Sequence, residues 1–130
     1  MNETAMEELE TMSEAAELMK LLSDPTRLRV LALLRPGEMN VTTLCERLGL
    51  AQPTVSHHLG LLRSAHLVQT RRAGKSIYYS LNPQYVMPCE KEHGLHLHYH
   101  HVDMTVSCDG ATNGHSVAAI SRGTPTPRMN

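Results

Sequence analysis

The sequence has no phenylalanine and no tryptophan, and four tyrosines are its only aromatic residues. Any core of the 130-residue chain must therefore be filled by leucine, valine, isoleucine, alanine and the eight methionines, and methionine packs well into irregular gaps. A chain of this length can bury one modest core. An aliphatic core of this kind favours a small, helix-rich fold.

Long apolar runs and a paired set of cysteines are also missing. No run approaches the roughly 18 residues that can span a bilayer, and residues 1–20 are acidic, unlike a basic secretory leader. The three cysteines, Cys45, Cys89 and Cys108, are an odd number that cannot form a closed disulfide set. We therefore expect a soluble, cytoplasmic protein without a membrane partner.

The sequence also lacks the common catalytic motifs. It contains no nucleophile elbow, no phosphate-binding glycine loop and no His-Glu-x-x-His pair. We therefore expect that the protein is not an enzyme.

Acidic residues are scarce in the middle of the chain, although the net charge of the whole is −1. Residues 1–24 contain seven acids and one base, residues 25–75 contain two acids and eight bases, and residues 76–130 contain four acids and three bases. These segments carry −6, +6 and −1. A cationic middle segment is typical of a protein that binds a polyanion such as double-stranded DNA.

Residues 42–62 of the cationic segment read as two short helices joined by a tight turn. Leu44 and Leu48 lie four residues apart and therefore share one face of the first helix. That helix should end at Gly49, because glycine tolerates the left-handed backbone of a helix end. The pattern indicates a helix-turn-helix; the alternative that the residues leave open is a surface helix pair of an ordinary helical domain.

The second helix of the pair begins near Gln52 and has one apolar and one polar face. Its buried positions follow the helical spacing i, i+4 and i+7, at Val55, Leu59 and Leu62. A helix-turn-helix inserts the N-terminal part of its second helix into the major groove of DNA. The candidate base-reading residues there are Gln52, Thr54, Ser56 and His57.

Two more helices are expected before this pair. Residues 6–22 form an amphipathic helix, which either packs as an ordinary core helix or covers a partner subunit. Its apolar positions are Met6, Leu9, Met12, Ala16, Met19 and Leu22. Asp24 as a cap and Pro25 at the first helical position begin a second helix, which runs to Leu34 or Arg35.

A β-hairpin is expected directly after the helix-turn-helix. Residues 67–72 and 76–81 are rich in β-branched and aromatic residues, and Ala-Gly-Lys separates them. A basic hairpin in this place acts as a wing, whose tip can lie along the DNA backbone or enter the minor groove and contributes charge rather than sequence reading; the alternative is a solvated basic turn. The candidate backbone-contacting residues on the recognition helix and the wing are His58, Arg63, Arg71, Arg72 and Lys75.

Four stretches in order carry a family resemblance, namely residues 22–31, 44–59, 61–68 and 71–81. With them, residues from about 6 to 83 resemble the arsenic-repressor (ArsR) family of winged-helix transcription regulators. The resemblance implies a homodimeric repressor that occupies a palindromic operator and releases it when an inducer, often a metal ion, binds. It also implies that Gln52, Ser56, His57 and His58 lie on the recognition helix.

The chain departs from the family pattern at several positions. Ala51 replaces a serine and His57 replaces an arginine that many members have, so a cap and a fixed charge are missing. Asn40 and Thr42 stand where the best-known metal site of the family has two cysteines. Cys45 alone, which we expect to be a packing residue, cannot replace those thiolates, so we expect that mode of sensing to be absent.

The family's last helix is also replaced, by a histidine-rich segment. From residue 95 to residue 100, leucine or tyrosine alternates strictly with histidine, a pattern that predicts a β-strand or hairpin. The candidate metal ligands of the segment are Cys89, His93, His96, His98, His100 and His101, near Asp103 and Cys108. Imidazole suits Zn²⁺, Ni²⁺ or Cu²⁺ as an inducer, although no cofactor is required; the alternative is a solvated histidine face.

The chain is therefore predicted to be an α+β protein, mainly α-helical, with a small β wing. Residues 1–83 form the winged helix-turn-helix domain with an N-terminal dimerisation helix, and residues 84–108 form the histidine-rich β segment. Residues 109–130 are rich in Gly, Ser, Thr, Asn and Pro and are predicted to be a disordered tail. A metal-storage or metallochaperone role is a rival function, but it would leave the basic wing unused.

Overall fold

The structure is a computed structural model of the chain, and it describes residues 2–89, 94–108 and 115–122. The chain forms two compact units. One unit consists of residues 21–87, and the other of residues 1–20 and 88–130.

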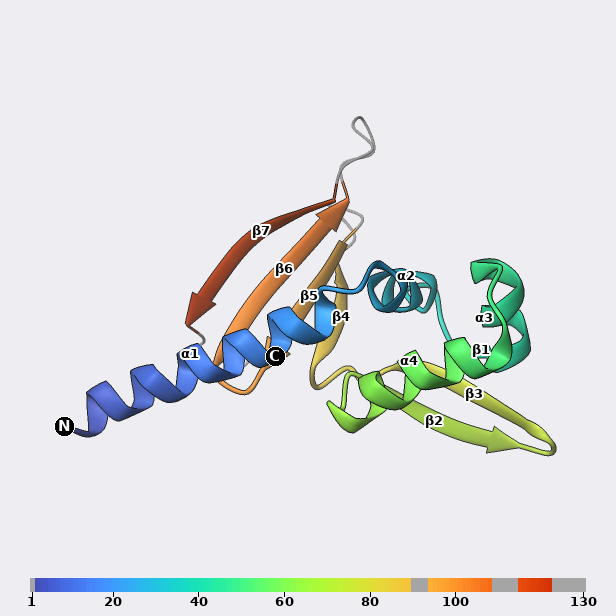
Figure 1. Cartoon of the computed structure of the whole chain (residues 1–130), viewed down its shortest axis with the longest axis horizontal. Coiled ribbons are helices and arrows are strands. Elements are labelled where there is room, and N and C mark those ends of the chain that lie inside the picture. The colour runs from blue at the N-terminus through green and yellow to red at the C-terminus, as the bar shows by residue number, and fades with distance from the viewer. Residues whose placement is uncertain (1, 90–93, 109–114, 123–130) are drawn as a thin grey trace, which may run out of the picture. The chain divides into compact units, whose positions relative to one another are not determined.

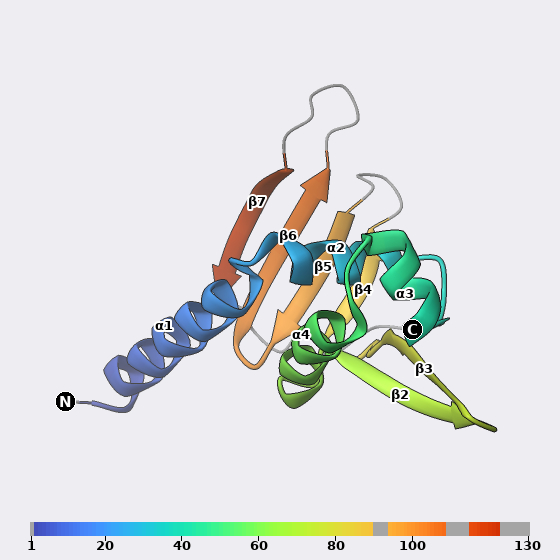
Figure 2. The same ribbon diagram turned by 45° about the vertical axis from the view of Figure 1, so that its right-hand side comes forward.

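The unit of residues 21–87 has a winged helix-turn-helix arrangement (Figures 1 and 2). A three-stranded antiparallel sheet of order β1-β3-β2 accompanies its helices. The elements are α2 (Pro25–Leu33), β1 (Met39–Asn40), α3 (Val41–Leu48), α4 (Gln52–Ser64), β2 (Val68–Ala73) and β3 (Ser76–Leu81). The predicted helices and hairpin are thus confirmed, and the short strand β1 was not predicted.

The helix ends in this unit follow from local chemistry. Asp24 caps α2, accepting hydrogen bonds from the backbone N–H groups of Thr26 at 2.7 Å and Arg27 at 3.3 Å. Asn40 caps α3 in the same way through Thr43 N–H at 2.8 Å. Gly49 ends α3 with φ 67°, a left-handed conformation that favours glycine.

The core of this unit is aliphatic, in line with the absence of phenylalanine and tryptophan. The helix-turn-helix buries the predicted residues, and neighbouring elements complete the core. Its fully buried large side chains include Val30, Leu31, Leu34, Leu44, Val55, Leu59, Leu62 and Leu67.

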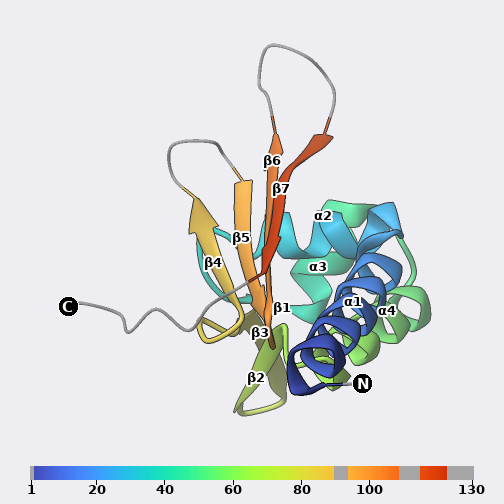
Figure 3. The same cartoon turned by 90° about the vertical axis from the view of Figure 1, so that its left-hand side faces the viewer.

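The second unit contains α1 (Glu3–Leu22) and a sheet of order β4-β5-β6-β7. The strands are β4 (Val86–Cys89), which begins within residues 21–87, β5 (Gly94–Tyr99), β6 (Val102–Cys108) and β7 (His115–Arg122). Helix α1 lies along one face of this sheet (Figure 3). The predicted C-terminal β structure is confirmed, and it is larger than a hairpin.

Glycine is needed where β5 begins. A side chain at Gly94 would collide with the backbone carbonyl of Val106, next to a register shift of the β6–β7 pair between Thr105 and Val106. The close approach of the two backbones therefore depends on the missing Cβ.

The apolar stripe of α1, which we expected either to pack in the core or to cover a partner subunit, is largely exposed. The buried residues are instead Thr11, Ala15, Leu18 and Leu22. Thr11 tolerates burial because its hydroxyl donates a hydrogen bond to the Glu7 carbonyl at 2.9 Å. The exposed fractions of Met6, Leu9, Met12 and Met19 are 52%, 55%, 64% and 47%, so of the predicted stripe only Leu22 lies in the core.

The predicted disordered tail needs correction over part of its length. Residues 115–122 form β7, which pairs antiparallel with β6 from Val102↔Arg122 to Cys108↔His115. The composition of the whole tail concealed the short apolar run from Val117 to Ile120, and β6 supplies hydrogen-bond partners for its backbone. The remainder of the predicted tail lies outside the described residues.

Within the described part of the chain, no helix is both long and apolar enough to cross a membrane.

Candidate nucleic-acid interface

Helix α4 presents the predicted base-reading residues on its open side. Gln52, Thr54, Ser56 and His57 are all exposed. The opposite side of the helix is fully buried through Val55, Leu59 and Leu62. Ala51 at the N-cap makes no side-chain hydrogen bond, so the first N–H groups of the helix lack the cap that a serine would supply.

His58 differs from its exposed neighbour His57. Its ring is half-buried, and its Nδ1 lies 3.3 Å from Nη1 of Arg27 on α2. The rings of His57 and His58 meet edge to face, with 5.6 Å between their centroids. His58 therefore has a fixed place between α4 and α2, and no local sequence pattern indicates this contact.

The hairpin carries its basic residues at the end away from the core. Its tip is a two-residue turn between the paired residues Ala73 and Ser76, and Gly74 adopts φ 62°. Arg72 and Lys75 are exposed. Since side chains alternate along a strand, Arg72 is on the same face of the hairpin as Val68, and Val68 is buried. The face of Arg72 is thus the face that packs inward at the base of the hairpin.

Arg71 lies on the other face and is held by Glu38. Its Nε and Nη2 donate to the two carboxylate oxygens of Glu38 at 3.1 Å and 2.5 Å, and its guanidinium lies 4.9 Å from the centre of the Tyr78 ring. The hydrogen bond from Arg71 lowers the pKa of Glu38, and the same bond raises the pKa of Arg71. Part of the cationic charge of the wing is therefore already compensated.

Removing this compensation should strengthen DNA binding. We expect Glu38→Gln to raise the affinity for a random duplex several-fold, because Arg71 is then available to a phosphate, and to steepen the salt dependence by up to about one unit. Fluorescence anisotropy at several salt concentrations measures both quantities. Glu46→Gln, which removes the same charge from an exposed position on α3, is the control. Equal gains from both variants would contradict a specific role of the Arg71–Glu38 pair.

The histidine-rich strand has the predicted alternation. Leu95 and Leu97 are buried, while His96 and His98 lie on the other face of β5. Asp103 of β6 is the carboxylate between these two rings. Its Oδ1 lies 2.5 Å from His98 Nδ1 and 3.8 Å from His96 Nε2.

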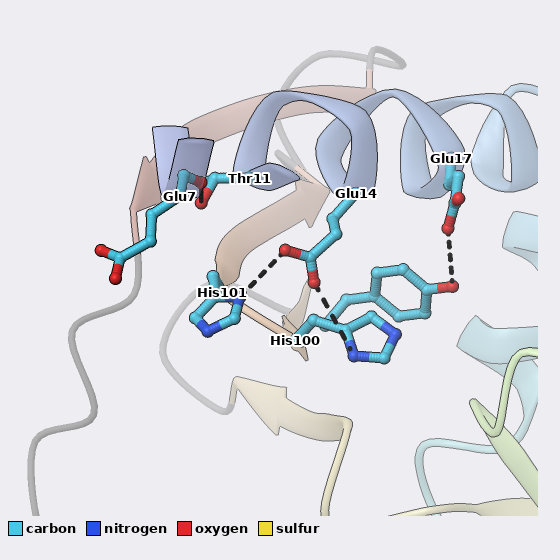
Figure 4. Close-up of polar contacts among 7 residues, drawn as sticks. Glu7, Thr11, Glu14, Glu17, His100 and His101 are labelled. Atoms are coloured by element: carbon cyan, nitrogen blue, oxygen red, sulfur yellow. Dashed lines mark hydrogen bonds and ion pairs between the residues drawn. The ribbon is translucent and has the colours of Figure 1, made fainter. Parts of the chain in front are cut away.

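The other two described histidines of this segment form the turn between β5 and β6, where they face α1 (Figure 4). The carboxylate of Glu14 on α1 contacts both rings. The distance is 2.9 Å from His101 Nδ1 to Oε1 and 3.7 Å from His100 Nδ1 to Oε2. Tyr99 adds a hydrogen bond from its hydroxyl to Glu17 at 3.4 Å. The four described histidines of the segment thus form two pairs, one beside Asp103 and the other beside Glu14.

This division bears on the predicted metal site. Among the residues that the structure describes, no group of three or more His, Cys, Asp or Glu side chains is placed to hold a metal ion. His93 and the side chain of Cys108 lie outside the described residues, and Cys89 is half-buried. The site stays a prediction, and it would need a ligand from elsewhere.

The contact between His101 and Glu14 should depend on pH. The hydrogen bond and the charge of Glu14 raise the pKa of His101 above 6.5, with smaller contributions from Glu10 and Glu7 and an opposing one from burial. A raised histidine pKa stabilises the folded state fully below the unfolded value, and the stabilisation disappears as pH rises through the folded value. The attachment of α1 to the turn should therefore be strongest below about pH 6.5 and weaken above the raised value.

Titration of the ring signals by NMR checks this dependence. We expect Glu14→Gln to move the His101 midpoint down, whereas Glu17→Gln, which affects the carboxylate that bonds Tyr99, should leave it in place. A His101 midpoint that is the same in the wild type and in Glu14→Gln would rule out the contact in solution.

Comparison with known proteins shows what this architecture is similar to. Residues 24–70 match the family described as bacterial regulatory protein, arsR family. The transcriptional repressor SdpR of Bacillus subtilis is 43% identical over 63 residues, which cover 48% of this chain and 70% of that protein. The HTH-type transcriptional regulator NmtR of Mycobacterium tuberculosis is 42% identical over 89 residues, covering 66% and 74%. The crystal structure of the transcriptional repressor BigR from Xylella fastidiosa matches with a TM-score of 0.53 at 42% identity, covering 62% of this chain and 81% of that one.

Proposed function

Because the chain belongs to the arsR family of bacterial regulatory proteins, we propose that it is a transcriptional repressor that binds a palindromic operator as a homodimer. The observation that carries the proposal is the exposed polar side of α4, with Gln52 and His57, in the same unit as an exposed basic hairpin tip. For such a regulator we also propose a cytoplasmic location and no enzymatic activity.

The roles of the interface residues divide by chemistry. Residues with hydrogen-bonding side chains near the start of α4 read bases, namely Gln52, Thr54, Ser56 and His57. Cations and donors beside them hold phosphates and set the register without reading sequence, namely His58, Arg63, Arg72 and Lys75. Arg71 contributes less than the others, since Glu38 already occupies its guanidinium.

The homodimer is proposed from the exposed stripe of α1. Four large apolar side chains of this helix are each about half exposed or more, namely Met6, Leu9, Met12 and Met19. Single exposed apolar residues are normal on a protein surface, but four on one helix indicate an interaction surface. A second copy of α1 is the partner that offers a matching surface, because a two-fold axis places the same residues on both sides. Two recognition helices then reach successive major grooves about 34 Å apart.

Sequencing the genomic DNA that co-purifies with the protein tests the proposal and identifies the operator. We expect enrichment of a short inverted repeat. Recovery of no DNA, or of fragments without a common sequence, would count against sequence-specific repression.

A metal-responsive repressor is the second candidate function. The observation that favours it is the placement of two imidazoles near one carboxylate at both Asp103 and Glu14, since nitrogen and oxygen donors suit Zn²⁺, Ni²⁺ and Cu²⁺. A further ligand from a second subunit would complete such a site. Titrating the protein with each ion while following operator affinity tests it; an unchanged affinity with all three ions would end it.

A further inference from the structure

Arg27 and His58 join the recognition helix to α2 by a side-chain contact. The guanidinium of Arg27 is anchored to the end of α1, because its Nε donates a hydrogen bond to the Leu21 carbonyl at 2.5 Å. Its Nη1 then lies 3.3 Å from His58 Nδ1. The backbone of Arg27 lies in the capped first turn of α2, where its N–H donates a hydrogen bond to Asp24. The guanidinium is therefore held in place before it meets the ring.

Asp24 supplies negative charge beside this contact. Burial raises the pKa of Asp24, but the hydrogen bonds from the backbone N–H groups of Thr26 and Arg27 and the positive charge of Arg27 outweigh this effect, so the pKa lies below the ordinary value. The carboxylate is thus ionised at neutral pH and balances the arginine.

The contact decides which tautomer His58 adopts. A guanidinium has N–H donors and no acceptor, so the bond requires a lone pair on His58 Nδ1. A neutral imidazole that accepts at Nδ1 carries its hydrogen on Nε2. The opposite tautomer, or the imidazolium, would turn an N–H toward another donor. The hydrogen bond from Arg27 therefore selects the tautomer of His58 that accepts at Nδ1 and carries its hydrogen on Nε2.

The Nε2–H group of His58 is a donor that can serve on the DNA-facing side of α4. His58 follows Thr54 by four residues and lies on the same side of α4, and side chains on a helix lean toward its N-terminus, the end that enters the groove. Half-burial leaves part of the ring open. We propose that Arg27 is a positioning residue for DNA binding, which orients the Nε2–H of His58 toward a DNA phosphate; the inference rests on the proposed DNA-binding function.

Two substitutions separate the two ends of the ring. Asparagine places its amide oxygen near the position of Nδ1, so His58→Asn keeps an acceptor for Arg27 but has no donor at the more distant position of Nε2. Glutamine places its amide nitrogen near the position of Nε2, so His58→Gln keeps the donor and weakens the bond to Arg27. We expect affinity for duplex DNA to fall about tenfold in His58→Asn and by no more than about threefold in His58→Gln, since a hydrogen bond to a charged partner carries this weight. Neither change removes a formal charge, so the salt slope should stay the same.

Arg27→Met tests the positioning role itself. Nitrogen-15 NMR of the full-length protein reports which ring nitrogen carries hydrogen, and we expect His58 to be the Nε2–H tautomer in the wild type and a mixture in Arg27→Met. DNA affinity of Arg27→Met should fall several-fold with an unchanged salt slope. Thermal unfolding of each variant separates loss of folding from loss of binding, because a merely structural Arg27 would not alter the tautomer in molecules that remain folded.

The outcomes distinguish this inference from the proposed function. A wild-type His58 that carries hydrogen on Nδ1, or a His58→Asn variant that binds as tightly as the wild type while His58→Gln does not, would overturn the inference and leave DNA binding intact. A wild-type protein that binds no duplex at low salt would overturn the proposed function, and with it the phosphate contact.

Discussion

Replacing Met12 by glutamate is expected to turn the dimer into a monomer and to lower the affinity for a palindromic operator about a hundredfold or more, because linked half-sites gain this much from simultaneous binding. Met12 is the most exposed of the large apolar side chains on α1, at 64%. A charge there costs the monomer little, yet it would be desolvated without a partner in a two-fold interface. Analytical ultracentrifugation measures the oligomeric state, and anisotropy measures the affinity.

The chain offers a matched control for this prediction. Met87 on β4 is an exposed methionine, at 40%, outside the α1 stripe. Met87→Glu should leave both the dimer and operator binding unchanged. A Met12→Glu variant that sediments as a dimer at the same concentration as the wild type would show that α1 is not the dimer surface.

The second large effect concerns the division between sequence reading and backbone contact. We expect Gln52→Ala to lose about 1–3 kcal/mol of operator binding and to bind a random duplex as before, because a lost base contact removes only discrimination. Arg72→Ala should weaken operator and random DNA alike and flatten the salt slope by about one unit. Arg29→Ala, which removes an exposed arginine from α2, is the control for net charge.

Anisotropy with both duplexes over a range of salt gives all of these quantities. If Gln52→Ala and Arg72→Ala lower the specificity ratio to the same extent, the assigned roles are wrong. If Arg29→Ala matches Arg72→Ala, the wing acts only through net charge.

The helix-turn-helix and its hairpin could be predicted because local signals define them. Asp24 and Asn40 cap the helices through N–H groups two or three residues away, and Gly49 adopts the left-handed conformation that ends α3. Each of these interactions lies within one turn of chain. Periodicity then gave the buried side of α4 correctly, because one stripe alone is apolar there.

The face of α1 could not be predicted in the same way. This helix has two adjacent apolar stripes, and periodicity does not say which of them meets the core. The structure buries the one with smaller residues, through Thr11 and Ala15. Thr11 is polar, and only its bond to the Glu7 carbonyl makes its burial acceptable.

The charged pairs of the molecule were also beyond sequence reasoning. Arg71 and Glu38 are 33 residues apart, and His101 and Glu14 are 87 residues apart. No local pattern connects such positions, so their proximity follows only from the folded chain. The consequence is large for function, since it reduces the free charge of the wing and divides the histidines between two carboxylates.

Mapping of amide chemical shifts with a short duplex at low salt tests the central claim most directly. The nitrogen-15-labelled full-length protein should show its largest changes in residues 52–58 of α4 and 71–75 of the hairpin. Largest changes instead at the β5–β6 turn and α1, or none on adding the duplex, would contradict the claim that the polar side of α4 and the basic hairpin tip bind DNA.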